Sequence, residues 1–258
     1  MSSDTTPHTL PDLLELGISL SQSKVILQAS QYAKEHCDPM VYNHTLRTAC
    51  WGLIIAQKVP HFSNVDRELV VVASILHDLG WAKTKELLSN DKRFEVDGAN
   101  AAKDFLSKND TREGQKWDEA RLQRTWDAIA LHTTPSIAVH AAPEVAVTHL
   151  AVVAEFMGPA LALGPDQPKL ITLDEYKAVT KVFPRTGFTF EGLKGLMCGL
   201  CRDKPETTYD NFVGRFGLNY GLDGNGKDKE KFAEALEASQ FVHLAKFGLD
   251  QLEALDSQ

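Results

Sequence analysis

The segment Leu69-Val-Val-Val-Ala-Ser-Ile-Leu-His-Asp-Leu-Gly80 is the strongest indication of the fold class of this chain. From Leu69 to Leu76 it is apolar on nearly every side, which is typical of a helix buried in the middle of a protein. His77 and Asp78 follow directly, and Gly80 stands where a glycine commonly ends a helix. We therefore predict a central helix over residues 65–79 that carries an imidazole and a carboxylate at its C-terminal end.

A buried His-Asp pair is unfavourable unless something compensates both groups, and a metal ion would do so. His44 precedes His77 by 33 residues (77 − 44), and Glu155 ends the apolar stretch that begins at Val145. Neutral imidazoles with carboxylates suit zinc, or iron, manganese and cobalt as the share of carboxylate rises. Taken alone, the dipeptide is also compatible with a purely structural role.

Helical spacing of apolar residues continues through almost the whole chain, and period-2 alternation is rare, so the sequence predicts an all-α protein. Its length fits one domain over residues 1–258, with a core at about 21–158 and a helical extension at about 170–250 that covers this core. We expect Ser21 or Ser23 to cap the first helix. The predicted helices cover residues 21–35, 42–58, 65–79, 97–106, 118–131, 143–157, 173–182, 189–201, 207–216 and 227–247.

The charge balance limits the classes of partner. The chain has 27 Lys and Arg against 35 Asp and Glu, a formal net charge of −8, so no broad basic surface is expected and nucleic acid is excluded as a main partner. No apolar run approaches the ~20 residues of a membrane span, and no secretory signal is evident. We expect a soluble, cytoplasmic protein without a membrane partner, whose four cysteines are reduced.

Four segments, one of them the end of the stretch quoted above, share a pattern with a known family. Val41–Arg47, Ile75–Gly80, Arg93–Ala102 and Ala128–Thr133 together resemble the HD-domain superfamily of all-α metal-dependent hydrolases, and within it the cyanamide hydratase branch. Asn211–Gly217 shares a looser similarity with the same branch. The resemblance implies an HD-type helical bundle over the first part of the chain.

This resemblance implies a set of metal ligands, namely His44, His77, Asp78 and Glu155. Family members usually place an Asp at the fourth position, so Glu155 is a departure by one methylene group. Phe94 stands where dinuclear members tend to place a histidine, which favours one divalent metal per chain. We expect zinc in preference to iron or manganese.

The resemblance also implies a reaction, in which metal-activated water adds to the nitrile carbon of a small substrate, cyanamide giving urea in the parent case. His132 is the candidate proton donor or orienting group, and Asp78 is a candidate proton shuttle. Asp97 has a second interpretation as a helix cap. The residues expected to contact the substrate are Trp81, Lys83, Glu95, Asp97 and Thr133.

Other functions stay open at this point. A phosphohydrolase acting on nucleotides or phosphomonoesters would use cations near the metal, for which Arg47 and Lys83 are the candidates. A non-catalytic HD-fold binding protein and a two-iron oxygenase are further alternatives. The apolar C-terminal residues Phe232, Leu236, Phe241, Leu244 and Phe247 also suggest a possible homo-oligomer.

Overall fold

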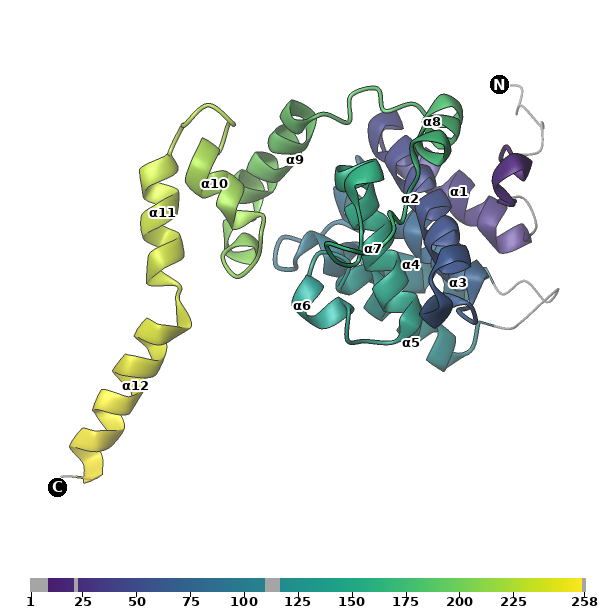
Figure 1. Ribbon diagram of the computed structural model, residues 1–258. Coiled ribbons are helices and arrows are strands. Elements are labelled where there is room, and N and C mark those ends of the chain that lie inside the picture. The colour runs from purple at the N-terminus through teal and green to yellow at the C-terminus, as the bar shows by residue number, and fades with distance from the viewer. Residues whose placement is uncertain (1–8, 21–22, 110–116, 257–258) are drawn as a thin grey trace. The chain divides into compact units, whose positions relative to one another are not determined.

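The computed structural model describes residues 9–20, 23–109 and 117–256, and within them the all-α prediction is confirmed (Figure 1). These residues contain helices and no strand, apart from isolated bridges between Leu13 and Ile18 and between Ala162 and Lys169. Ser21, one of the two candidate caps, lies outside the described residues. Within them, no helix has both the length and the apolar composition of a membrane span.

The chain divides into two compact units, residues 1–89 with 94–188 and residues 90–93 with 189–258. The first unit contains α1 (Lys24–His36), α2 (Pro39–Lys58), α3 (Arg67–Leu76), α4 (Phe94–Lys108), α5 (Glu119–Ala130), α6 (Pro135–Ala138), α7 (Pro143–Met157) and α8 (Leu173–Val182). The second contains α9 (Phe190–Asp203), α10 (Gly214–Tyr220), α11 (Lys229–Ala238) and α12 (Phe241–Asp256). That the C-terminal helices cover the core stays a prediction.

Helix α3 lies in the core of the first unit, as its composition predicts. Every residue from Leu69 to Leu76 is buried, and α3 packs against α1, α2, α5 and α7. Its N-terminus is capped by Asp66, whose carboxylate accepts a hydrogen bond from the amide of Leu69. The burial of α3 therefore fixes the position of the residues that follow it.

The helix ends at Leu76, before the predicted limit, and the role expected for Gly80 was wrong. Gly80 lies in a short 3₁₀ helix, Leu79–Trp81, after the His-Asp pair. A Cβ atom on it would lie 1.9 Å from the carbonyl oxygen of Phe94, and one on Gly98 would lie 2.8 Å from that of His77. These glycines allow α4 to approach the His-Asp turn closely.

Helices α7 and α8 have the predicted bounds, whereas the other predicted helices differ at one or both ends, three of them in ways that the local contacts explain. Helix α4 begins at Phe94, so Asp97 lies inside the first turn and does not cap it. Residues 207–216 are not one helix, because the Asn211 side chain accepts a hydrogen bond from Val213 and offers the backbone an alternative to helix. The predicted helix 227–247 is divided into α11 and α12 at Ser239 and Gln240, whose side chains donate to the carbonyl of Leu236.

Candidate metal centre

Three buried side chains from two neighbouring elements meet at one point. His44 comes from α2, and His77 and Asp78 come from the turn after α3. The Nε2 atoms of the two histidines lie 3.1 Å apart, and each lies 3.1 Å from Oδ2 of Asp78. All three residues are at most 1% exposed. Their ligand atoms therefore form an equilateral triangle shielded from water.

The hydrogen bonds of the two Nδ1 atoms define the tautomers of His44 and His77. Nδ1 of His77 lies 2.7 Å from the carbonyl oxygen of Ser74, and Nδ1 of His44 lies 3.0 Å from Oε2 of Glu155. Because a carbonyl or an ionised carboxylate can only accept, both Nδ1 atoms carry the proton. In the neutral rings the two Nε2 atoms then face each other as bare lone pairs.

This arrangement fits a divalent metal. Both oxygens of Asp78 are buried and have no hydrogen-bond partner in the described part of the chain, and such a carboxylate is strongly unfavourable without a cation. For metal bonds of about 2.0–2.2 Å, neighbouring ligand atoms lie about 3.0–3.5 Å apart, which matches the observed triangle. His44, His77 and Asp78 are thus able to hold a metal ion.

His132 extends this pattern from the end of α5. Its Nδ1 atom lies 2.6 Å from the carbonyl oxygen of Ile129, so that Nε2 faces Oδ1 of Asp78 at 3.7 Å. Burial and the nearby His77 lower the pKa of His132 to about 4, so its ring is neutral at pH 7. His149, a buried residue of α7, donates from Nδ1 to the backbone oxygen of His132 and holds this turn.

Glu155 touches the triangle only through His44. Its Oε1 atom accepts from Trp51 Nε1 at 2.7 Å and from Arg47 Nε at 3.0 Å. Its Oε2 atom accepts from Arg47 Nη2 at 2.7 Å and from Arg185 Nη1 at 3.3 Å, in addition to His44. A carboxylate offers about four lone-pair positions, and these contacts occupy them.

The electrostatics follow from these contacts. Although burial opposes ionisation, the neighbouring His77 and His44 hold the pKa of Asp78 far below its ordinary value. Burial also opposes ionisation of Glu155, yet the contacts with His44 and Arg47 hold its pKa at about 2. The pKa of His44 is raised, because its contacts with Asp78 and Glu155 outweigh burial, which acts in the opposite direction. Both carboxylates are therefore ionised at pH 7.

Aromatic rings surround the triangle. The ring of Phe188 stacks on that of His44, with centroids 4.3 Å apart and an interplanar angle of 12°. Phe156, which is half exposed, lies 5.8 Å from Phe188. The ring of Trp81 lies 6.4 Å from that of His44, and its buried Nε1 has no hydrogen-bond partner among the described residues. The surroundings of the centre are thus mainly apolar.

The other expected substrate contacts have definite positions. Thr133 donates from its hydroxyl to the buried carboxylate of Glu95, one residue after His132. Asp97 is buried and accepts from the amide of Ser89, so it holds the loop before α4. Lys83 has an exposed side chain, and its amide donates to the carbonyl of His36. Of these predicted substrate contacts, Thr133 is the one that directly follows a residue of the site, His132, in the sequence.

Sequence reasoning missed several supporting residues. Arg47 was considered only as a phosphate partner, and Trp51, Arg185 and Phe188 carried no motif. Arg47 and Trp51 contact Glu155, which lies more than a hundred residues later in the sequence. Arg185 and Phe188 lie in the loop after α8, and they contact Glu155 and His44 respectively. The hydrogen bond from Nδ1 to the carbonyl three residues earlier, shared by His77 and His132, is the one signal that local spacing could have supplied.

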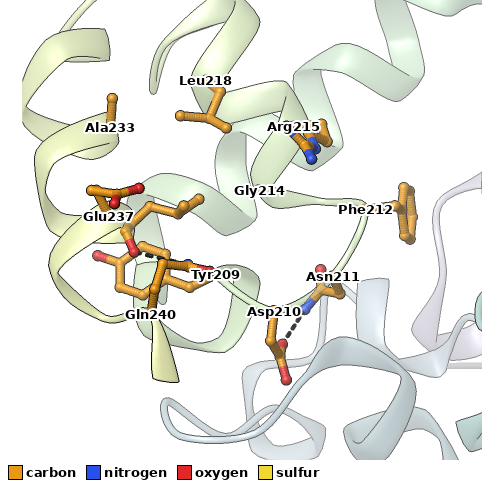
Figure 2. A pocket seen from close by; sticks show the side chains of 11 residues that line it. Tyr209, Asp210, Asn211, Phe212, Gly214, Arg215, Leu218, Ala233, Glu237 and Gln240 are labelled. Atoms are coloured by element: carbon orange, nitrogen blue, oxygen red, sulfur yellow. Dashed lines mark hydrogen bonds between the residues drawn. The ribbon is translucent and has the colours of Figure 1, made fainter. Parts of the chain in front are cut away.

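A separate hollow of about 880 Å³ lies within the second unit, between the segment at Tyr209, α10 and α11 (Figure 2). Its lining includes Asp210, Arg215, Leu218 and Glu237, and Asn211 donates to Asp210 at 3.0 Å. Among the described residues, the side chains that could hold a metal ion together are those of the triangle in the first unit, and they do not line this hollow. The chemistry of the chain is therefore expected at the triangle.

One family model matches the part of the chain that carries these residues. Residues 41–157 match the family described as HD domain, and the match includes His44, His77, Asp78, His132 and Glu155. This supports the HD-domain superfamily, whose domains bind divalent metals, and a class of metal-dependent hydrolases. No curated protein matches the chain.

Proposed function

With an HD domain at residues 41–157, we propose that the chain is a metal-dependent hydratase or hydrolase acting on a small uncharged substrate, with a nitrile such as cyanamide as the first candidate. The observation that carries the proposal is the buried triangle of His44, His77 and Asp78. Within the described residues, the two carboxylate oxygens of Asp78 lack hydrogen bonds. A divalent metal bound there would polarise water and lower its pKa toward 7. One metal per chain is proposed, with zinc first.

His132 is the proposed proton-transfer group. Since its Nδ1 donates to Ile129 and its pKa is about 4, Nε2 presents a lone pair toward the site at neutral pH. It would accept a proton from water and return it to the nitrogen of the substrate, which is the donor role among the two alternatives expected from the sequence. Thr133 and Glu95 hold the adjacent backbone.

The surroundings support an uncharged substrate. Arg47, a candidate partner for phosphate oxygens, instead binds Glu155 and the carbonyl oxygens of Phe183 and Pro184. The rings of Phe188 and Trp81 offer apolar contact, and the free N–H of Trp81 offers one hydrogen bond. A charged phosphate would have to compete with Glu155 for the guanidinium of Arg47.

The experiment is metal analysis of protein purified without added metal, followed by assays with cyanamide, other small nitriles and phosphomonoesters. We expect about one divalent metal per chain and formation of an amide or urea product. Release of phosphate instead would replace the nitrile by the phosphohydrolase alternative. Protein that binds no metal even after dialysis against zinc, iron or manganese would overturn both, in favour of a non-catalytic protein.

A further inference from the structure

Helix α12 presents a broad apolar face that nothing in its own unit covers. None of its residues is buried, and the exposed fractions of Phe241, Leu244, Leu249, Leu252 and Leu255 lie between 57% and 77%. With 3.6 residues per turn, they fall on one side of the helix together with Val242, Ala245 and Gly248. Such a face on an otherwise charged helix is typical of an interaction surface.

The glycine in the middle of this face is a second observation. Glycine inside a helix is less favourable than alanine by about 1 kcal/mol. A Cβ atom on Gly248 would meet no atom within 4 Å, so packing within the described protein does not require a glycine there. The absence of a side chain would allow a second helix to approach α12 closely at this point.

The charges of α12 are divided along its length. Lys246 lies in the N-terminal half, whereas Asp250, Glu253 and Asp256 lie in the C-terminal half. Lys246 and Glu253 are seven residues apart and therefore border the same edge of the apolar face. Two copies of α12 side by side in opposite directions bring these edges together, so that Lys246 of each copy faces Glu253 of the other. In a parallel pair these edges would lie on opposite sides of the contact, so that Lys246 and Glu253 of the two copies would not meet.

We propose that α12 is a self-association surface, through which two copies of this chain pair in antiparallel orientation. The apolar face supplies the contact and the divided charges supply the orientation. A lipid surface is disfavoured, because membrane-binding helices carry an excess of Lys and Arg on the polar face and α12 carries more acidic than basic residues. The proposal is independent of the metal centre.

Sedimentation equilibrium of the full chain over a range of concentrations tests the proposal. We expect the mass to rise from 28.5 kDa toward twice that value. Leu252→Lys should weaken self-association at least about tenfold, because it places a charge in the apolar contact. Leu163→Lys is the matched control, since Leu163 is also half exposed but lies outside α12, and it should leave self-association unchanged.

Charge reversal tests the orientation. Lys246→Glu and Glu253→Lys should each weaken self-association, and the double variant should restore it, because the opposite charges again face each other. Circular dichroism checks that each variant keeps its helices. A chain that is monomeric at all concentrations, a dimer insensitive to Leu252→Lys, or a double variant no better than the single ones would overturn the proposal.

Discussion

Nδ1 of His44 lies 3.0 Å from Oε2 of Glu155, and this contact turns Nε2 of the same ring toward His77 and Asp78. The carboxylate that the family resemblance predicts as a fourth ligand thus contacts the triangle through a histidine. Carboxylates that orient a ligating histidine in this way fix its tautomer and strengthen metal binding. The sequence alone favoured direct ligation by Glu155, and the two roles predict different variants.

If Glu155 orients His44, Glu155→Gln should weaken metal binding by about 10–100-fold and leave the visible spectrum of the Co²⁺-loaded protein unchanged. Glu155→Asp should also weaken binding, because the shorter side chain loses its contact with His44. Titration with Co²⁺ measures both. If Glu155 is instead a ligand, Glu155→Asp keeps the affinity and Glu155→Gln changes the spectrum.

His77→Ala should remove the metal and the activity while helix content stays close to that of the parent. The reason is that one corner of the triangle is lost, whereas the packing of α3 is made by residues before His77. Added zinc should raise the melting temperature of the parent after chelation, but not that of the variant. His61→Ala, at an exposed position, is the control, and full metal occupancy in His77→Ala would contradict the ligand assignment.

Arg47→Met should destabilise the metal-free protein by about 3–5 kcal/mol, since it removes the main partner of a buried carboxylate. Arg185→Met changes a second guanidinium on Glu155, but its side chain is 29% exposed, and we expect a loss of about 1 kcal/mol or less. Urea unfolding measures both. Equal effects would mean that Arg47 does not compensate the charge of Glu155.

Gly80→Ala should destabilise the protein by at least about 2 kcal/mol, because its Cβ would lie 1.9 Å from the backbone oxygen of Phe94. The displaced α4 should also weaken metal binding through the adjacent His77. Gly164→Ala adds the same atom in a loop, where the nearest atom lies 3.4 Å away, and should stay within about 0.5 kcal/mol of the parent. Thermal unfolding of the two variants gives the comparison.

Asp66→Asn tests the pH dependence of stability away from the metal. Burial opposes ionisation of Asp66, but Arg121 outweighs it and lowers the pKa below 3.8. A carboxyl group with a lowered folded pKa stabilises the protein above the unfolded value and loses this contribution as the pH falls. We expect Asp66→Asn to lower the free energy of unfolding by about 1–2 kcal/mol at pH 7. This difference should shrink below pH 3.8, and urea unfolding measures it at both pH values.

The matched control for this prediction is Asp104→Asn. Asp104 pairs with Lys108 on the surface of α4, where both side chains are more than half exposed. Its effect should be about 0.5 kcal/mol or less at either pH. A difference for Asp66→Asn that grows as the pH falls would show that Asp66 does not stabilise the protein as a carboxylate.

The sequence determined those features that depend on neighbours in the chain. The apolar run from Leu69 to Leu76 predicts a buried helix because its composition leaves no face for water. The bounds of α7 and α8 were predictable because Pro143 and the Thr172–Glu175 capping box act locally. The HD resemblance likewise pointed to His44, His77 and Asp78, which the structure brings together.

The surroundings of these residues depend on the tertiary structure. The partner of Glu155 depends on which side chains α2 and the loop before α9 bring to it, and neither Arg47 nor Arg185 is near it in the chain. Gly80 is a second example. Its position in the sequence is typical of a helix end, whereas in the structure the close approach of α4 explains why a glycine is needed there. Local propensity cannot report such contacts, since hydrogen bonding and close packing between distant segments are properties of the assembled core.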